Sequence, residues 1–190
     1  MTSESDRQRL LQIAREAIVN HVEGTPRTAP ASESAAPQPA AGAFVTIHHR
    51  GELRGCIGHL EANQPLPAVI RDCAIAACSA DPRFPPVTAG ELSGLEIEIS
   101  LLGPLEPVTA TEDIQVGRDG LVVEHGWQRG LLLPQVATER QWDRETFLAQ
   151  TCHKAGLSPH AWKRGAKIWR FEAEVFGEGD GAGGAGRTGA

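Results

Sequence analysis

The chain has 190 residues, a formal net charge of −6 and a pI near 5.6, and its length suits one domain with room for a small subdomain. The acidic balance argues against a protein drawn to nucleic acid by charge, and no apolar run approaches the roughly 18 residues of a membrane span. Four cysteines and a polar N-terminus without a secretory pattern predict free thiols in a cytoplasmic protein, and the absence of tyrosine excludes any mechanism that needs a phenol.

The first predicted element is an amphipathic helix over residues 4–22, because apolar residues recur there at helical spacing. We expect its apolar stripe to dock on the main body of the protein. Residues 23–42 are rich in Ala, Pro and Ser, which predicts an extended or disordered linker. The main domain is therefore expected at residues 43–176, followed by a disordered glycine-rich tail at residues 177–190.

Residues 44–58 predict a β-hairpin that turns at His49-Arg50-Gly51. A two-residue turn would put Ile47 on the same face as Arg54, which fits the apolar pattern poorly. A turn with Gly51 in a left-handed bulge position fits better. That turn places one apolar set on a single face: Ala43, Val45, Ile47, Leu53, Gly55 and Ile57.

In this register Arg54 and Cys56 lie side by side on the other face, about 6–7 Å apart. A guanidinium beside a thiol favours the thiolate, which is the reactive form of cysteine. Gly55 and Gly58 flank the thiol, and a glycine inside a strand indicates a bulge or a close approach. The alternative is that Cys56 is a small buried apolar residue beside two tolerated glycines.

A helix is expected from about Pro67 to Ala80, with Cys73 and Cys78 as ordinary core thiols. The next six residues, 81–86, read Asp-Pro-Arg-Phe-Pro-Pro and cannot be helical. One interpretation is a rigid loop that presents Asp81 and Arg83 to a substrate. The other is a stiff connector in which Asp81 caps the turn and pairs with Arg83.

The second half of the chain predicts further elements of both kinds. A capping box at Thr88–Glu91 precedes an alternating strand at Leu95–Leu102. A second hairpin is expected over residues 120–133, with its turn through residues 126–129. A helix capped by Asp143 and ended by Gly156 and a strand over residues 167–176 complete the domain. The one dense basic group is Lys163, Arg164, Lys167 and Arg170.

Several of these segments together resemble the AMMECR domain family, and within it the bacterial AmmeMemoRadiSam system protein A group. They spread over residues 42–176. The segments that carry the resemblance are Gly42-Ala-Phe-Val-Thr-Ile, Gly51 to Leu60, Asp81 to Pro86, Leu131-Leu-Leu-Pro-Gln-Val and Lys154-Ala-Gly-Leu157.

The resemblance implies an α+β fold with a large mixed, mostly antiparallel sheet built from a duplicated β-α-β-β unit. It implies association with a Memo-type protein and a radical-SAM protein, and it supplies no reaction. The family motif maps onto Arg54, Gly55, Cys56 and Gly58, and onto Asp81, Arg83 and Phe84. His59 departs from the motif, although it lies three residues from Cys56.

Two functions are compatible with these residues. In the first, the chain is an enzyme or enzyme subunit that uses Cys56 as a reactive thiol and His59 or His48 as a base. Arg54 and Arg83 would hold an anionic small molecule or modified substrate. In the second, the same surface is the docking face of a non-catalytic, substrate-presenting subunit. A metal enzyme is a third reading, but Cys56-x-x-His59 supplies at most two ligands, so neither a metal nor a cofactor is expected.

Overall fold

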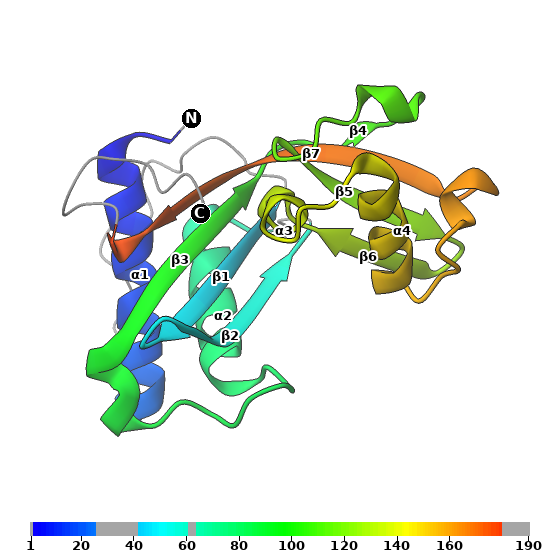
Figure 1. Cartoon of the computed structure of the whole chain (residues 1–190). Helices are drawn as coiled ribbons and strands as arrows, with labels where there is room; N and C mark the ends of the chain where they lie inside the picture. The colour runs from blue at the N-terminus through cyan, green and yellow to red at the C-terminus, as the bar shows by residue number, and fades with distance from the viewer. Residues whose placement is uncertain (1, 26–41, 61–63, 180–190) are drawn as a thin grey trace. The chain divides into compact units, whose positions relative to one another are not determined.

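The computed structural model describes residues 2–25, 42–60 and 64–179, and the chain divides into two compact units (Figure 1). Of the described residues, the first unit comprises those up to Leu102 together with residues 174–179, and the second comprises residues 103–173. Most of the predicted linker and most of the predicted tail lie outside the described residues. Within the described residues, no helix is long and apolar enough to cross a membrane.

The first unit begins with helix α1 (Glu4–Glu23), which confirms the helix predicted over residues 4–22. The side chain of Ser3 caps its first turn, and Gly24, in the left-handed region at φ 67°, ends it. The apolar stripe of α1 packs against helix α2 (Leu66–Ser79). The buried residues of that stripe are Leu10, Ala14, Ala17 and Ile18.

Three antiparallel strands form the sheet of the first unit: β1 (Gly42–His49), β2 (Glu52–His59) and β3 (Leu95–Leu102). Strand β1 lies between the other two, which leaves β2 at an edge. Helices α1 and α2 cover the same face of this sheet (Figure 1). A short 3₁₀ helix, Ala89–Gly94, precedes β3 and begins at the predicted capping box.

The hairpin of β1 and β2 confirms the predicted faces from Gly55 onward but not the predicted turn. His49 pairs with Glu52, so the turn holds only Arg50 and Gly51, whose φ angles of 55° and 83° are those of a type I′ turn. The extra residue that brings the two apolar sets onto one face is instead a bulge further along β2. Ile47 pairs with Gly55 but His48 pairs with Leu53, so Arg54 is the extra residue.

This bulge has two consequences for the faces of the hairpin. Beyond it the pairs Val45 with Ile57 and Thr46 with Cys56 lie as predicted, the first facing the core. Before it Leu53 leaves the apolar face and is 40% exposed, so its predicted place in the core was wrong.

The second unit is also built from a hairpin, helices and a returning strand. Strand β5 pairs antiparallel with β6 on one side and β7 on the other, and β4 pairs with the far side of β7. The strands are β4 (Glu106–Pro107), β5 (Asp119–His125), β6 (Gln128–Leu132) and β7 (Lys167–Gly177); the helices are α3 (Pro134–Glu139) and α4 (Arg144–Lys154), with 3₁₀ turns at Thr111–Asp113 and Ala161–Lys163.

Helix α4 packs on this hairpin, and its buried Phe147 and Leu148 form a core with Ile114, Leu121 and Ala137. Asp143 caps α4 as predicted, because its side chain accepts a hydrogen bond from the backbone N–H of Thr146 at 2.8 Å. The predicted four-residue turn of the second hairpin was too long, since His125 pairs directly with Gln128. Helix α3 and strand β4 were not predicted.

The α+β class is confirmed. Each unit has the element order strand, strand, helix, strand: β1-β2-α2-β3 in the first and β5-β6-α4-β7 in the second. The duplication implied by the resemblance is therefore present, but the helix follows the second strand of each repeat and not the first.

Candidate functional site

The site is centred on Cys56, whose side chain is half-buried on the edge strand β2. The strand register places Thr46 directly opposite on β1. The Thr46 hydroxyl donates a hydrogen bond to Cys56 Sγ at 3.3 Å, and Thr46 itself is only 8% exposed. The sulfur is thus held by a fixed neighbour while it keeps access to solvent.

The loop after α2 covers the free edge of β2 at this residue. The backbone N–H of Cys56 donates to Asp81 Oδ2 at 2.9 Å, and the Arg83 guanidinium donates to the carbonyl of Cys56 at 3.3 Å. Asp81 is 4% exposed and accepts two further hydrogen bonds from the Arg83 guanidinium, at 2.9 and 2.6 Å. An edge strand exposes unpaired backbone groups, and here two side chains satisfy them.

The same contacts fix the electrostatics of the loop. The hydrogen bond from the Arg83 side chain holds the pKa of Asp81 well below its usual range. Burial acts in the opposite direction and raises this pKa, while the hydrogen bond from the Cys56 N–H lowers it further. The pKa of Arg83 is raised first by Asp81, and the side chain of Cys56 is a smaller cause in the same direction. The cation that contacts Cys56, through its backbone carbonyl, is therefore Arg83 and not Arg54.

Arg54 does not have the role that the predicted register gave it. As the bulged residue it turns toward the loop, where it bonds Glu91 at 2.7 Å and the carbonyls of Pro85 and Pro86 at 2.8 and 3.2 Å. Arg54 is the largest cause that lowers the pKa of Glu91 to about 2, followed by the N–H of Thr88. Its guanidinium thus fastens the 85–91 segment to β2 and is committed within the chain.

The two glycines of the motif do not clear space around the thiol. A Cβ on Gly55 would lie 2.1 Å from the carbonyl oxygen of Ala77, so this glycine lets α2 approach the strand. A Cβ on Gly58 would lie 2.3 Å from the ring of Phe44, which fills the space over it. Both glycines therefore have a packing role, and the substrate-binding role predicted for Gly55 and Gly58 stays a prediction.

His59 and Phe84 are the remaining predicted site residues. His59 ends β2 three positions after Cys56, and side chains alternate along a strand, so the two leave on opposite faces. The structure therefore does not bring the predicted base to the thiol. Phe84 is half-buried, and the Arg83 guanidinium lies 5.4 Å from its ring centroid, close enough for a cation–π contact.

The other three cysteines are unlike Cys56, because all of them are buried. Burial raises the pKa of Cys73 and of Cys78 to about 11, and it also raises the pKa of Cys152. These thiols are core residues, as predicted for Cys73 and Cys78. In the part of the chain that the structure describes, no group of three or more His, Cys, Asp or Glu side chains is placed to hold a metal ion.

Two residues of this network were not singled out from the sequence. Thr46 shares a face with Cys56 in the predicted register, so its contact with the sulfur could have been found there. Glu91 was assigned only a capping role, which it has, since its carboxylate accepts from the N–H of Thr88 at 2.8 Å. The contact of Glu91 with Arg54 depends on the bulge in β2, and the local sequence pattern does not predict it.

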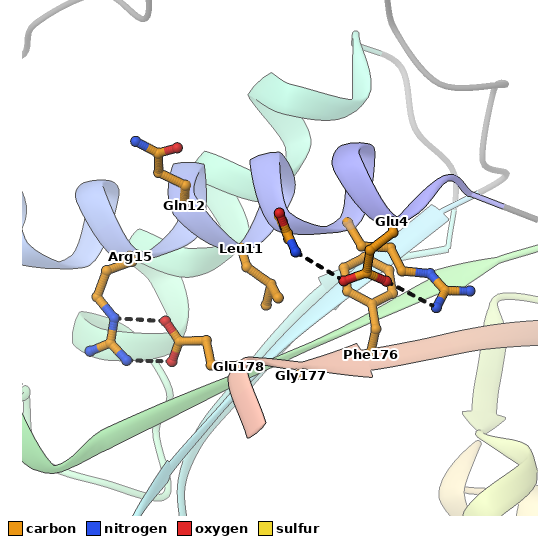
Figure 2. Close-up of a pocket in the computed structure, with 9 residues that line it drawn as sticks. Glu4, Leu11, Gln12, Arg15, Phe176, Gly177 and Glu178 are labelled. Atoms are coloured by element: carbon orange, nitrogen blue, oxygen red, sulfur yellow. Dashed lines mark hydrogen bonds and ion pairs between the residues drawn. The ribbon is translucent and has the colours of Figure 1, made fainter. Parts of the chain in front are cut away.

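A cavity of about 360 Å³ lies elsewhere in the first unit, between α1 and the end of β7 with Glu178 after it (Figure 2). In its lining, Arg15 pairs with Glu178, and Leu11 and Phe176 form the apolar part. Arg7 also lines the cavity and pairs with Glu4 and with Glu174, so both arginines of the lining are already paired with carboxylates.

Comparison with known proteins agrees with this architecture. The AMMECR1 family model matches residues 11–176. A protein of Methanothermobacter thermautotrophicus is 44% identical over 184 residues, covering 93% of this chain and 96% of that protein. Protein MJ0810 of Methanocaldococcus jannaschii is 49% identical over 146 residues, covering 72% of this chain and 73% of its own length. The crystal structure of protein PH0010 from Pyrococcus horikoshii superposes with a TM-score of 0.83 at 40% identity, covering 90% of each chain. The chain belongs to the AMMECR1 family.

Proposed function

We propose that this AMMECR1-family protein is a cytoplasmic enzyme or enzyme subunit that holds an anionic small molecule or modified substrate at Cys56 and Arg83. Cys56 is its reactive thiol, and Arg83, in place of Arg54, is the cation that binds the anionic group. Arginine suits this role because its planar guanidinium forms paired hydrogen bonds to carboxylate and phosphate groups.

One observation carries the proposal: a buried carboxylate positions an exposed guanidinium against the backbone of the half-buried Cys56. Asp81 is fixed by four hydrogen bonds from Arg83 and Cys56, yet the Arg83 side chain is still 52% exposed. A guanidinium that is anchored on one side and solvated on the other can bind an anion without losing its orientation.

The system in which the protein acts is also a proposal. Residues 51–60 and 81–86 resemble the bacterial AmmeMemoRadiSam system protein A group, and they are the segments that build the Cys56–Arg83 site. This coincidence supports a role alongside a Memo-type protein and a radical-SAM protein.

The test is the rate of alkylation by iodoacetamide, followed at each cysteine by mass spectrometry. We expect Cys56 to react roughly tenfold faster than the three buried thiols, and Arg83→Gln to slow it about threefold or more. Arg118→Gln is the matched control, because Arg118 is also 40% exposed and paired with a buried aspartate, Asp119. Equal rates in the wild type and the Arg83 variant would remove the basis for the proposal.

Cys56→Ser separates reactivity from stability. Because Cys56 is half-exposed, the serine variant should lose alkylation at this site while its melting temperature stays within about 2 °C of the wild type. A variant that unfolds would show that the cysteine is structural.

A non-catalytic, substrate-presenting subunit is the second candidate. This candidate is favoured because Arg54 and Asp81 make hydrogen bonds within the chain. Arg83, beside the exposed Pro82 and Pro85, would then form the docking face. Pull-down with purified Memo-type and radical-SAM proteins distinguishes the two. If Arg83→Ala abolishes capture while Cys56→Ser binds normally and no activity depends on the thiol, the docking function is correct.

A further inference from the structure

Trp127 at the tip of the second hairpin is 95% exposed. Among the large apolar residues that the structure describes as exposed, the others are between 37% and 40% exposed. Transfer of an indole out of water is strongly favourable, since a tryptophan buries about 150–250 Å² of surface. An indole left almost wholly in solvent is therefore unusual and needs an explanation.

The turn that carries Trp127 is short and well anchored. It holds only Gly126 and Trp127, and the φ of 63° at Gly126 with a following residue of negative φ is the pattern of a type II′ turn. Behind the turn, the Gln128 side chain donates to the carbonyl of Gly156 at 2.8 Å. Gly130 lies so close to the end of α4 that a Cβ there would be 2.3 Å from the nitrogen of Ala155. The indole is thus presented from a fixed backbone.

The sequence segments at this turn are rich in basic residues, although the whole chain carries a charge of −6 and Arg129 beside the turn pairs with Glu124. Residues 125–129 and 153–167 contain no Asp or Glu, and residues 153–167 contain all three lysines of the chain. Lys167 begins β7 directly opposite Glu124, at the end of β5 that leads into the turn. Lys154 ends α4 one residue before the Ala155 that contacts Gly130.

We propose that Trp127, Lys154 and Lys167, here called the Trp127 surface, dock an acidic partner protein. The partner would present an apolar pocket for the indole, rimmed by Asp and Glu side chains. Tryptophan and arginine are the residues most enriched among those that dominate binding at protein interfaces. Complementary charge steers such partners together, and a rigid anchor loses little conformational entropy on binding.

The same features argue against two other ligands. A single-stranded nucleic acid is held by several aromatic side chains that stack successive bases, and this surface has one. Membrane binding by an interfacial segment needs a broad apolar face, whereas here one indole projects from a two-residue turn. A protein pocket is the partner that one rigid indole with a basic rim fits best.

The experiment measures binding of the full-length chain to purified Memo-type and radical-SAM proteins, so the choice of probes rests on the proposed function. We expect Trp127→Ser to weaken binding about tenfold or more and Trp127→Phe to weaken it less, because phenylalanine still fills part of the pocket. Lys154→Glu with Lys167→Glu should weaken binding further at low salt than at high salt. Leu53→Ser and Arg50→Glu, at the tip and flank of the first hairpin, are the matched controls and should bind like the wild type.

A second readout uses the location of the lysines. Because the chain has lysine at three positions only, acetylation of Lys154, Lys163 and Lys167, measured against the terminal amine, reports almost entirely on this surface. Binding should protect Lys154 and Lys167 in the wild type and should not protect them in Trp127→Ser at the same partner concentration.

The outcomes separate this inference from the proposed function. Normal binding by Trp127→Ser, or binding without lysine protection, would overturn the Trp127 surface and leave the proposed partners in place. Absence of wild-type binding to either probe would overturn both the surface and the partners, but not the Cys56–Arg83 site, which alkylation tests. Trp127-dependent binding to anionic phosphatidylglycerol vesicles or to a single-stranded oligonucleotide, without binding to the proteins, would also overturn it.

Discussion

The two units of the molecule solve the same packing problem with glycine at the same place. In each, the second strand of a hairpin lies against the end of a helix, and a glycine makes the approach possible. Gly55 of β2 meets the carbonyl of Ala77 in α2, and Gly130 of β6 meets the nitrogen of Ala155 after α4. The repeat is therefore visible in atomic contacts as well as in the element order.

The two units share a second packing arrangement, but their hairpins differ in register. An aromatic ring covers a glycine on the neighbouring strand in both, Phe44 over Gly58 and Phe171 over Gly120. The first hairpin then departs by a bulge and by the loop that covers its edge, whereas the pairing of β5 with β6 runs without a register shift. The two units therefore pack in the same way, and the candidate sites lie where the two hairpins differ.

The sharpest test of this parallel is to add a methyl group at both contact glycines. Gly55→Ala and Gly130→Ala should each lower the free energy of unfolding by about 3 kcal/mol or more, because backbone atoms lie where the Cβ would be and cannot move aside cheaply. Urea denaturation followed by circular dichroism measures the loss.

Gly90→Ala is the matched control, since a Cβ there would meet nothing within 4 Å and the residue lies in a 3₁₀ helix. It should change stability by about 0.5 kcal/mol or less, with a gain more readily than a loss. A large effect at Gly55 with a small one at Gly130 would show that the two units are similar only in topology.

The next effect concerns the buried aspartates, one in each unit, that are paired with an exposed arginine. Asp81 is 4% and Asp119 1% exposed, and each accepts a backbone N–H as well as an arginine. Asp81→Asn and Asp119→Asn should each cost about 2 kcal/mol at pH 7, because an amide cannot accept from every one of these donors. Only Asp81→Asn should also change alkylation of Cys56, since Asp119 lies in the other unit.

A smaller effect is the acid dependence of the first unit. The pKa of Glu91 is lowered to about 2 by Arg54 and Thr88, and the pKa of Asp81 is lowered by Arg83. A carboxyl with a lowered folded pKa adds stability that is complete above its unfolded pKa and is lost as the pH falls through the folded value. The free energy of unfolding should therefore fall between about pH 4.5 and pH 2.

Glu91→Gln measures how much the contacts of Glu91 with Arg54 and Thr88 contribute to this acid dependence. We expect it to cost about 1 kcal/mol at pH 7 and to flatten the decline below pH 4.5, while Glu112→Gln, in the exposed first turn of a 3₁₀ helix, should leave the profile unchanged. An unchanged acid profile in Glu91→Gln would mean that the Arg54 contacts do not stabilise the loop.

The first hairpin also shows how far its sequence predicts its structure. Apolar alternation reports only the parity of two strands, so it correctly placed Val45 and Ile47 with Gly55 and Ile57. A bulge in the turn and a bulge in the strand restore the same parity, and alternation cannot distinguish them. The type I′ turn at Arg50-Gly51 and the bulge at Arg54 were missed for this reason, and with them the true direction of the Arg54 side chain.

The edge contacts of β2 could be predicted only in part. One of the two interpretations of the Asp-Pro-Arg sequence had Asp81 pair with Arg83, and the structure has this pair. That the pair also satisfies the N–H and carbonyl of Cys56 depends on the path of the chain after α2, which no local pattern encodes. Helix α3 was missed because its six residues are too few to show a helical period.

The smallest expected effect on the free energy of unfolding concerns Trp127 at the tip of the second hairpin. Trp127 is 95% exposed, so Trp127→Ser should change the free energy of unfolding by no more than about 0.5 kcal/mol. Trp162→Ser, a half-buried tryptophan packed on the core of the same unit, is the contrasting variant and should cost several times more. Urea titrations of both variants give the comparison directly. A loss above about 1 kcal/mol in Trp127→Ser would mean that the indole packs on its own chain in solution, and the argument for a docking surface would then lose its first premise, since an indole that already has a partner needs no other.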